Sequence, residues 1–403
     1  MPVLSLLERD RRWKLARDEM RKRDLSCLIV SGLMGGFANY TEWLANDSRV
    51  QFVIFPLDRE PLCIMLLTQS QYRDRTDPWV ADHRAGPIFS EAIVNRLREL
   101  DISSGKVGVV GVAPQGMATQ GTIPYTTWTG VLGALPRVTF EDATWWLTEL
   151  TLPKSDEEMK FVEKTAQITE LGCEAFVSAV KPGVGEDALY RAFVKRIVDE
   201  NAQVQMYLSG VGRTTLVQFE PEWLNAGAAP KILHSGEIVT TEMDVCYARY
   251  HAQVQQCVAL KPVDDTHLKC SAISQEVVEA ARATLRPGVK FQDVAEAVEA
   301  PLQRARAWHP GPMVHSMNPQ ILRTPHSADY STGKLGQTVG GNNSTSYFQL
   351  VRGADIVLKK NMVFEVEPCV CLGDHRVLLG GTVAVEEGGP RFLNKLAFEM
   401  QVV

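Results

Sequence analysis

Two strand-like stretches carry carboxyl and amide side chains that could do acid–base chemistry. The first, Gly236–Leu260, contains Glu242, Gln253 and Gln255. The second, Met362–Val370, contains Glu367. A carboxyl removed from water beside another carboxyl has a raised pKa, so it can act as a general acid or base near neutral pH. Glutamine amides add neutral donors and acceptors that suit an amide, a urea or a similar group. These side chains are therefore candidates for catalysis and substrate binding, provided that the fold brings them together.

Histidines in the loop-rich C-terminal third are further candidates for a general base, and they are His315, His326 and His375. A histidine taken alone is more often structural or exposed than catalytic. We prefer His326 as the general base because Asp329 and Tyr330 stand beside it.

The eight cysteines are scattered and contain no CxxC motif. This usage is typical of reduced thiols and predicts a cytoplasmic protein rather than a disulfide framework. Cys246 and Cys369 stand on strand-like stretches, and nothing near them in sequence lowers a thiol pKa. We expect both to be buried and inert.

The composition excludes several classes of partner. The chain has 403 residues and 45% hydrophobic residues, which predicts two or three domains with sizeable cores. Its net charge of −6 offers no basic face for nucleic acid or anionic lipid. The charged N-terminal stretch resembles neither a signal peptide nor a membrane span. The expected partner is a small-molecule substrate, with no nucleic acid and no membrane.

The elements that must position these residues fall into two regions. Leu6–Arg23 has helical apolar spacing, and short buried-strand runs such as Cys27–Val30 then alternate with helical patterns up to about residue 148. This alternation predicts an α/β domain. Pro153 breaks the chain, and Ser155 can cap a long helix that extends from about 156 to 180.

The second region contains a weak internal repeat. Ala179–Val184 recurs as Thr284–Val289, and an amphipathic helix follows each copy. Two copies predict a duplicated half-domain rather than a solenoid. Gly236–Leu260 is predicted to form two consecutive strands with a turn near Cys246, because β-branched and apolar residues dominate both halves.

Several motifs together resemble the aminopeptidase P/prolidase/creatinase family (peptidase family M24): LPKSDEEM, MDVCYARYHAQV, LKKNMVFEVEP and LLGGTVAVEEGGPRFL. The resemblance implies an α/β N-terminal domain over residues 1–148. It also implies an α+β "pita-bread" catalytic domain over residues 149–403, with an internal pseudo-twofold duplication. It implies a homodimer as well.

Peptidases of this family hold two metal ions with two Asp, one His and two Glu. With Tyr250-His251-Ala252 as anchor, the two aspartate positions fall on Glu242 and Gln253. The histidine position falls on Gln337, the first glutamate is kept as Glu367, and the second falls on Gly380. Two carboxylates out of five ligands cannot compensate the charge of two metal ions. We therefore expect no metal and no cofactor. If a register slip of two residues brings Asp244 in place of Glu242, the site would hold a single weak metal at most.

Creatinase is a member of this family that works without metal and splits a C–N bond of a small guanidino acid. Its second pocket glutamate falls on Gln255, and the segment that carries its catalytic histidine matches residues 225–231, which contain none. Lys231 or His234 could substitute only with a different loop. An arginine that binds the substrate carboxylate is matched by Arg49.

The resemblance places Glu242 and Glu367 in one pocket, lined by Tyr250, Gln253, Gln255 and Gln337. His251 follows Tyr250 and is expected on the opposite face. We predict a metal-independent, creatinase-like hydrolase that cleaves a C–N bond, or makes a related cleavage, in a small polar, nitrogen-containing carboxylate. One alternative is a non-catalytic binding protein on the same fold. The other is a metal-dependent Xaa-Pro peptidase or lyase.

Overall fold

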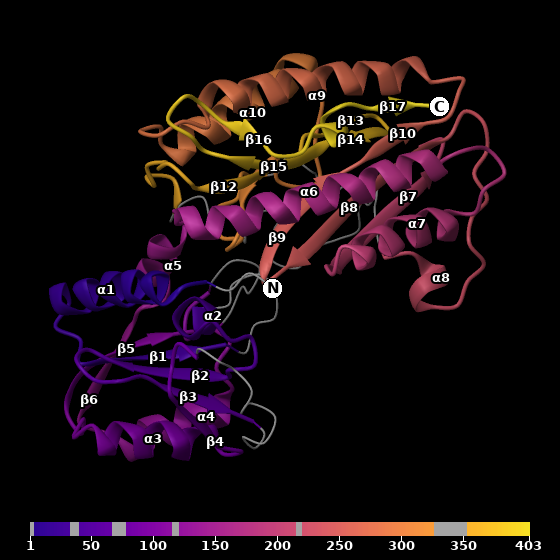
Figure 1. Cartoon of the computed structure of the whole chain (residues 1–403). Coiled ribbons are helices and arrows are strands. Elements are labelled where there is room, and N and C mark those ends of the chain that lie inside the picture. The colour runs from indigo at the N-terminus through magenta and orange to yellow at the C-terminus, as the bar shows by residue number, and fades with distance from the viewer. Residues whose placement is uncertain (1–3, 33–39, 67–77, 115–120, 215–219, 326–352) are drawn as a thin grey trace. The chain divides into compact units, whose positions relative to one another are not determined.

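The structure is a computed structural model that describes residues 4–32, 40–66, 78–114, 121–214, 220–325 and 353–403 (Figure 1). The chain forms two compact units. The first contains residues 1–157 and 319–321, and the second contains residues 158–318 and 322–403. The predicted division between residues 148 and 149 falls inside helix α5 (Thr144–Thr151).

The first unit contains, among its described residues, a six-stranded sheet in the order β4-β3-β2-β1-β5-β6. Strand β1 is antiparallel to β2 and parallel to β5. The strands are β1 (Cys27–Ser31), β2 (Phe52–Pro56), β3 (Leu62–Met65), β4 (Asp82–Ala85), β5 (Gly105–Val110) and β6 (Val138–Asp142). The helices besides α5 are α1 (Leu6–Lys22), α2 (Tyr40–Ala45), α3 (Phe89–Glu99) and α4 (Tyr125–Ala134).

Alternation along β1 builds two cores, one on each face of this sheet. Leu28 and Val30 pack with residues of α1, α2 and α5. Cys27 and Ile29 pack with residues of α3 and α4. Because successive strand residues point to opposite faces, an apolar run with no polar alternation must be covered on both sides. The predicted α/β domain is thus a three-layer sandwich.

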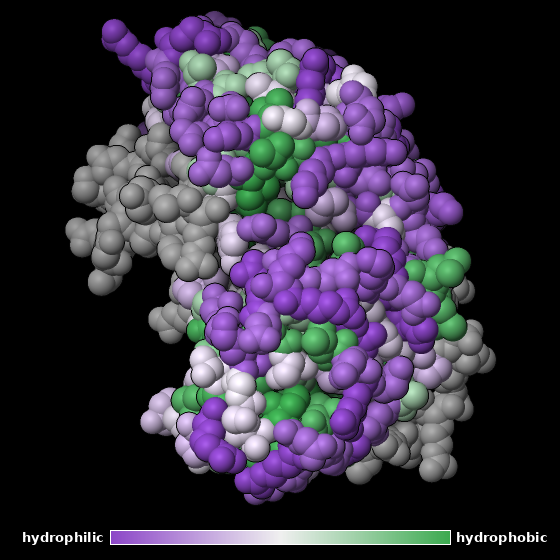
Figure 2. All heavy atoms as spheres, turned by 90° about the vertical axis from the view of Figure 1, so that its left-hand side faces the viewer, coloured by the Kyte–Doolittle hydropathy of each residue, from purple (hydrophilic) through white to green (hydrophobic). Residues whose placement is uncertain are grey.

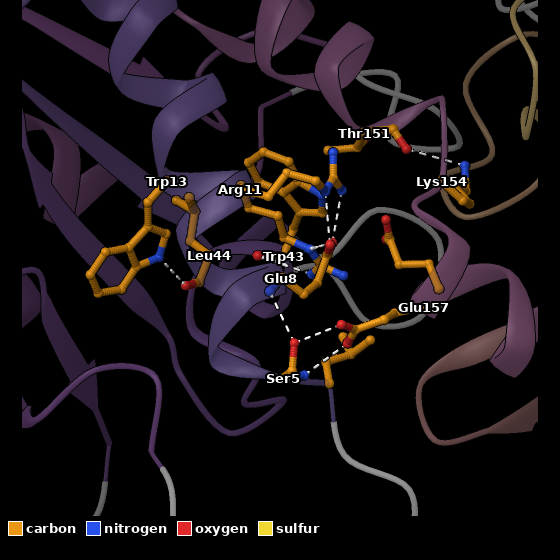
Figure 3. A network of polar contacts seen from close by, with 12 residues as sticks. Ser5, Glu8, Arg11, Trp13, Trp43, Leu44, Thr151, Lys154 and Glu157 are labelled. Atoms are coloured by element: carbon orange, nitrogen blue, oxygen red, sulfur yellow. Dashed lines mark hydrogen bonds and ion pairs between the residues drawn. The ribbon is translucent and has the colours of Figure 1, made fainter.

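A buried polar network joins α1 to the end of this unit (Figure 3). Arg11 and Arg12 both donate to the Glu8 carboxylate at 2.7 Å. Ser5 caps α1 by accepting from the Glu8 N–H, and it donates from Oγ to Glu157 at 2.6 Å. These bonds fix the start of α1 against the residue at which the first unit ends.

The second unit contains, in the described part of the chain, a nine-stranded sheet ordered β11-β12-β15-β9-β8-β10-β17, with β7 paired to β8 and β16 to β15. Its strands are β7 (Gln203–Gly212), β8 (Ile238–Tyr247), β9 (Tyr250–Gln255), β10 (Cys257–Ala259), β11 (Val314–Ser316), β12 (Val363–Val366), β15 (Gly380–Ala384), β16 (Arg391–Phe392) and β17 (Gln401–Val402). A separate hairpin consists of β13 (Cys369–Leu372) and β14 (His375–Leu378). The helices are α6 (Asp156–Ala179), α7 (Glu186–Asp199), α8 (Glu222–Asn225), α9 (Asp265–Thr284), α10 (Phe291–Ala305) and the 3-10 turn η3 (Leu396–Phe398).

The stretch Gly236–Leu260 forms β8, β9 and the short β10, so the predicted pair of strands is present with a third added. The turn lies at Ala248 and Arg249, two residues after the predicted place. Their φ angles are 49° and 73°. Positive φ at both central residues is the backbone that lets a two-residue loop match the twist of a hairpin.

Helices cover one face of the larger sheet. Met243 of β8 and Val254 of β9 belong to a core with residues of α6 and α7. On β12, Phe364 stacks on Phe291 of α10 with ring centroids 5.9 Å apart. Figure 1 shows α6 extending along this sheet. The residues that alternate with Met243, Val254 and Phe364 must therefore point to the other face.

The internal repeat is visible in matching backbone contacts. The Gly183 N–H donates to the Leu233 carbonyl at 2.8 Å, and the Leu233 N–H donates to Val184 at 2.9 Å. The second copy repeats this pattern, since Gly288 donates to Leu358 at 2.9 Å and Leu358 donates to Val289 at 2.8 Å. Both glycines have a left-handed φ, 88° and 89°. The predicted duplication is thus confirmed at the level of backbone hydrogen bonds.

Hydrophilic residues cover most of the face shown in Figure 2, and the hydrophobic areas between them are small. In the described ranges no helix has the length and apolar character needed to cross a membrane.

Candidate active site

The second unit's sheet carries polar side chains on the face away from the helices, and we call this set the polar face. His315 pairs with Glu365, which pairs with Thr382. Gln253 pairs with Asp244 on the next strands. Paired residues, and residues two apart on a strand, point to the same side of a sheet. The polar face consists of Glu242, Asp244, His251, Gln253, Gln255, His315, Glu365, Glu367 and Thr382.

Both carboxylate oxygens of Glu367 have a partner on this face. Gln255 donates from Nε2 to Oε2 at 2.8 Å, and His315 Nε2 lies 3.2 Å from Oε1. Burial and the nearby charge of Glu242 raise the pKa of Glu367 well above its usual value. Burial and the charge of Arg323 lower the pKa of His315 to about 3. Because both shifts favour the uncharged forms of the two groups, we assign this contact to a hydrogen bond rather than to an ion pair.

Gly380 makes the contact between Gln255 and Glu367 sterically possible. It stands between their strands and pairs with Gln255. A Cβ at this position would lie 2.2 Å from the Val366 carbonyl oxygen and 2.7 Å from Gln255 Oε1. The φ of 154° also disfavours any residue with a side chain. Position 380 therefore admits glycine alone on this backbone.

Glu242 is held by the second glutamine. Gln253 donates from Nε2 to Glu242 Oε1 at 2.9 Å. Burial raises the pKa of Glu242, against the opposing charges of Arg376 and Arg323. The charge of Glu242 also raises the pKa of Glu367, so the two carboxyls affect each other's ionisation.

A histidine–aspartate pair lies on the same face. His251 Nδ1 is 2.9 Å from Asp244 Oδ1, and the Asp244 side chain is almost fully buried. Burial opposes the charged imidazole, but the charge and hydrogen bond of Asp244 outweigh it, so the pKa of His251 is raised well above its usual value. Asn318 fixes the backbone by bonding both the N–H and the carbonyl of His251.

The prediction for Tyr250 and His251 was the reverse of this arrangement. Tyr250 donates to Glu158 on α6 at 3.1 Å and stacks on Phe161, so its side chain points to the helical face. The physical reason is strand alternation, because Tyr250 differs in parity from Gln253 and Gln255 while His251 shares it. The Tyr250 side chain therefore packs on the helical face of the sheet and not on the polar face.

Two other candidate residues, Arg49 and His375, have partners outside the polar face. Arg49 donates from Nε and Nη2 to Asp47 at 2.9 and 2.8 Å, within the first unit. His326 and Gln337 lie outside the described residues. His375 lies 3.6 Å from Asp264 and has its ring near His267.

Sequence reasoning underestimated the surroundings of Cys369. Cys371 and Arg376 hydrogen-bond its sulfur, and although burial opposes ionisation, they lower the pKa of Cys369 to about 6. Arg376 pairs with Cys371 across the hairpin, which no local sequence pattern reveals. Cys369 is buried, as predicted. The prediction that nothing lowers its thiol pKa is wrong.

A known protein family matches most of the second unit. Residues 160–395, more than half of the chain, match Metallopeptidase family M24. The chain belongs to family M24.

Relatives of this M24 chain include a creatinase and an Xaa-Pro dipeptidase. It is 22% identical to a creatinase of a Bacillus species over 98% of this chain and 93% of the relative. It is 20% identical to an Xaa-Pro dipeptidase of Lactobacillus helveticus over 59% of this chain and 58% of the relative.

Solved M24 structures share the fold over the whole length. The X-Pro aminopeptidase of Thermotoga maritima superposes with a TM-score of 0.74 at 14% identity, covering 97% of this chain and 99% of that one. The prolidase of Thermococcus sibiricus gives 0.74 at 15% identity, covering 100% of both chains. The predicted pita-bread fold with an α/β N-terminal domain is confirmed.

The side chains of this M24 member do not fit the two-metal centre of the family. Position 380 admits no side chain, and the Gln253 amide is already bonded to Glu242. Arg376 and Arg323 add positive charge that opposes a bound cation. Within the described ranges, no three His, Cys, Asp or Glu side chains are grouped so as to hold a metal ion.

Proposed function

We infer that the chain is a metal-independent hydrolase that cleaves a C–N bond in a small polar, nitrogen-containing carboxylate. One observation carries this proposal, the contact of Glu367 with Gln255 on one oxygen and His315 on the other. A carboxyl held in this way is fixed for proton transfer rather than for binding a cation. The creatinase relative, matched over nearly its whole length, supports the reaction class.

Glu367 is the proposed acid–base group. In its ionised form it takes a proton from water while the hydroxide adds to the carbon of the C–N bond. It returns that proton to the leaving nitrogen, so the products are an acid and an amine. Its raised pKa brings it toward the working pH that such a group needs. His315 is a positioning residue, because its contact with Oε1 orients the carboxyl.

Glu242 is the second proposed acid–base group, and Gln253 holds its orientation. His326, the general base preferred from sequence, stays a prediction, and so does Gln337 as a substrate contact. Arg49 stays the proposed partner of the substrate's acid group. Asp47 already accepts from two of its donors. A homodimer and a cytoplasmic location complete the proposal.

The test begins with the full chain, dialysed against EDTA and analysed for metal. A panel of amides, ureas, guanidino acids and betaine-like osmolytes is then screened by thermal shift and for turnover. We expect metal-free protein to turn over at least one compound. Glu367→Gln should lose about 100-fold or more of that activity, whereas the exposed control Asp355→Asn should lose none. Two tightly bound ions per chain, or full turnover by Glu367→Gln, would overturn the proposal.

The strongest competing function is a metal-dependent Xaa-Pro peptidase, which the family and the Lactobacillus helveticus relative favour. It predicts that Xaa-Pro dipeptides are hydrolysed only after a divalent metal is added. A non-catalytic binder predicts ligand-induced thermal shifts without turnover by any compound of the panel.

A further inference from the structure

Cys246 is a nucleophilic side chain that the proposed function does not use. All eight cysteines lie within the described ranges, and Cys246 is the one that is not buried. The prediction of a buried thiol at this position is therefore wrong. The reason is its place in the fold, because it is the last residue but one of β8 and the partly exposed turn follows it directly. A thiol has to be reachable before it can react.

Strand alternation puts this thiol on the polar face. Glu242, Asp244 and Cys246 follow one another at steps of two residues along β8, so their side chains point to the same side. Cys246 pairs directly with His251 of β9. Side chains that stand opposite each other in this way begin about 5 Å apart, which is close enough for a sulfur to meet an imidazole. The side chains of Cys246 and His251 do share a hydrogen bond.

His251 links the thiol to a carboxylate. Its Nδ1 lies 2.9 Å from Asp244 Oδ1. A carboxylate only accepts hydrogen bonds, so Nδ1 carries a hydrogen and Nε2 is left as the basic nitrogen of the ring. Asn318 holds the backbone of His251 through two hydrogen bonds, of 2.9 and 3.0 Å. The series thiol, imidazole, carboxylate is that of a nucleophile, its base and the group that orients the base.

This series lies apart from the carboxyl of the proposed function. His251 and Gln255 are four residues apart on β9, which places about 13 Å between them along the strand. Gln255 is the residue that donates to Glu367. A carbon within bonding reach of the Cys246 sulfur is therefore not the carbon on which Glu367 acts. Cys246 and His251 form a second reaction centre on the same face.

We propose that Cys246 is a catalytic nucleophile that accepts the acyl group of a small ester or thioester, with His251 as its acid–base partner and Asp244 as the residue that positions His251. The inference goes beyond the proposed function and does not rest on it. A thiol beside an oriented imidazole is suited to acyl transfer, because the imidazole can both remove a proton from the nucleophile and deliver it to the leaving group.

The reaction has two steps. In the first, the sulfur bonds to the acyl carbon, and the thiol proton passes through His251 to the alcohol or thiol that leaves. A thioester on Cys246 remains. In the second, water adds to that thioester, and His251 takes a proton from the water and returns it to the departing sulfur. The products are a carboxylic acid and the original thiol.

The first experiment uses wild-type protein alone. Full-length, EDTA-treated protein is mixed with para-nitrophenyl acetate, release of nitrophenolate is followed by absorbance, and the acetylated peptide is mapped by mass spectrometry after an acid quench. We expect the acetyl group on Cys246, formed about 100-fold faster than on the same cysteine in the urea-unfolded chain. Acetylation of Cys246 no faster than in the unfolded chain, or acetyl groups on other residues only, overturns the inference.

Variants then assign the roles. Cys246→Ala should reduce nitrophenolate release to the background rate. His251→Asn should slow acetylation of Cys246 about 100-fold. Asp355→Asn removes an exposed carboxylate that bonds Lys290 and should change nothing. Full acetylation rate in folded His251→Asn contradicts the role of His251. If a variant does not fold, the comparison of folded with unfolded wild type still decides.

The positioning role of Asp244 needs a measurement that a general loss of stability would not move. Alkylation of Cys246 by iodoacetamide is followed against pH in wild type and Asp244→Asn. We expect wild type to react well below the ordinary thiol pKa of about 8.5, and the profile of Asp244→Asn to move toward that value. An unchanged profile in the folded variant contradicts positioning by Asp244. Failure of the proposed function is recognised separately, by a metal requirement for turnover of the nitrogen-containing compounds.

Discussion

Gln255 reaches Glu367 across Gly380, donating a 2.8 Å hydrogen bond over a residue that has no side chain. The family resemblance assigns the second metal-binding glutamate to position 380. A side chain at this position and the hydrogen bond between Gln255 and Glu367 exclude each other.

Substitution of Gly380 by alanine should destabilise the protein strongly. The new Cβ meets the Val366 carbonyl oxygen at 2.2 Å, and the backbone cannot relax without breaking the β12–β15 pairing. We expect a loss of about 3 kcal/mol or more in the free energy of unfolding. Gly388→Ala is the matched control, because its Cβ has nothing within 4 Å. Equal denaturant midpoints for the two variants would contradict this reading.

The pair His251–Asp244 should make stability depend on pH. The pKa of His251 is raised in the folded state, so its contribution is complete below the unfolded value of about 6.5 and is lost as pH rises through the folded pKa. His251→Asn should therefore cost most, about 2 kcal/mol, at pH 6 and less toward alkaline pH. Urea titrations across this range measure the difference. His234→Asn, which removes an exposed imidazole, is the control for the substitution itself.

Glu365 should also make the folded protein less stable as pH rises, here because ionising a buried carboxyl is unfavourable. Its folded pKa is raised, so the wild type loses stability as pH rises from the unfolded value of about 4.3 toward the folded pKa. Glu365→Gln does not titrate and should gain on the wild type by up to about 1.4 kcal/mol per pH unit in that window. Chemical denaturation at several pH values measures the gap. A gap that stays constant between pH 5 and 8 would show that Glu365 is ionised throughout.

In the first unit, Glu8→Gln should be strongly destabilising. It leaves the Arg12 guanidinium, only 2% exposed, without its carboxylate partner between Trp43 and Trp79. A buried charge that loses its partner costs about 3 kcal/mol or more. Asp18→Asn removes an exposed partner of Lys14 and Arg21 on the same helix and should leave the unfolding curve nearly unchanged.

Sequence reasoning reached the elements that depend on local pattern. The helix predicted at Leu6–Arg23 is α1, the long helix after Ser155 is α6, and both copies of the repeat are present. Apolar spacing, proline and glycine carry this information, because they act within a few residues. The placement of Glu242 and Glu367 in one site is an expectation from the family resemblance, and the charge of Glu242 does act on Glu367.

What the sequence did not reveal depends on contacts between distant segments. Arg376 acts on Cys369 only because β13 and β14 pair, and His315 meets Glu367 only because β11 is the neighbour of β12. The orientation of Tyr250, in contrast, depends on local sequence alone. Tyr250 and Gln253 are three residues apart on one strand, so alternation puts their side chains on opposite faces.

The cross-strand pairing of the polar face has a consequence for how this sheet assembles. The strands β11, β12, β9 and β8 have carboxyl, amide or imidazole groups on the polar face, and β15 between them has the Thr382 hydroxyl there. Apolar residues of this sheet pack against helices on the other face. A slip of one residue in any of these pairings would bury charge under α6 or α10 and expose valine, methionine or phenylalanine opposite. The residues proposed for catalysis thus also specify the register in which these strands pair. Replacing them with apolar residues should make pairing in a shifted register less unfavourable.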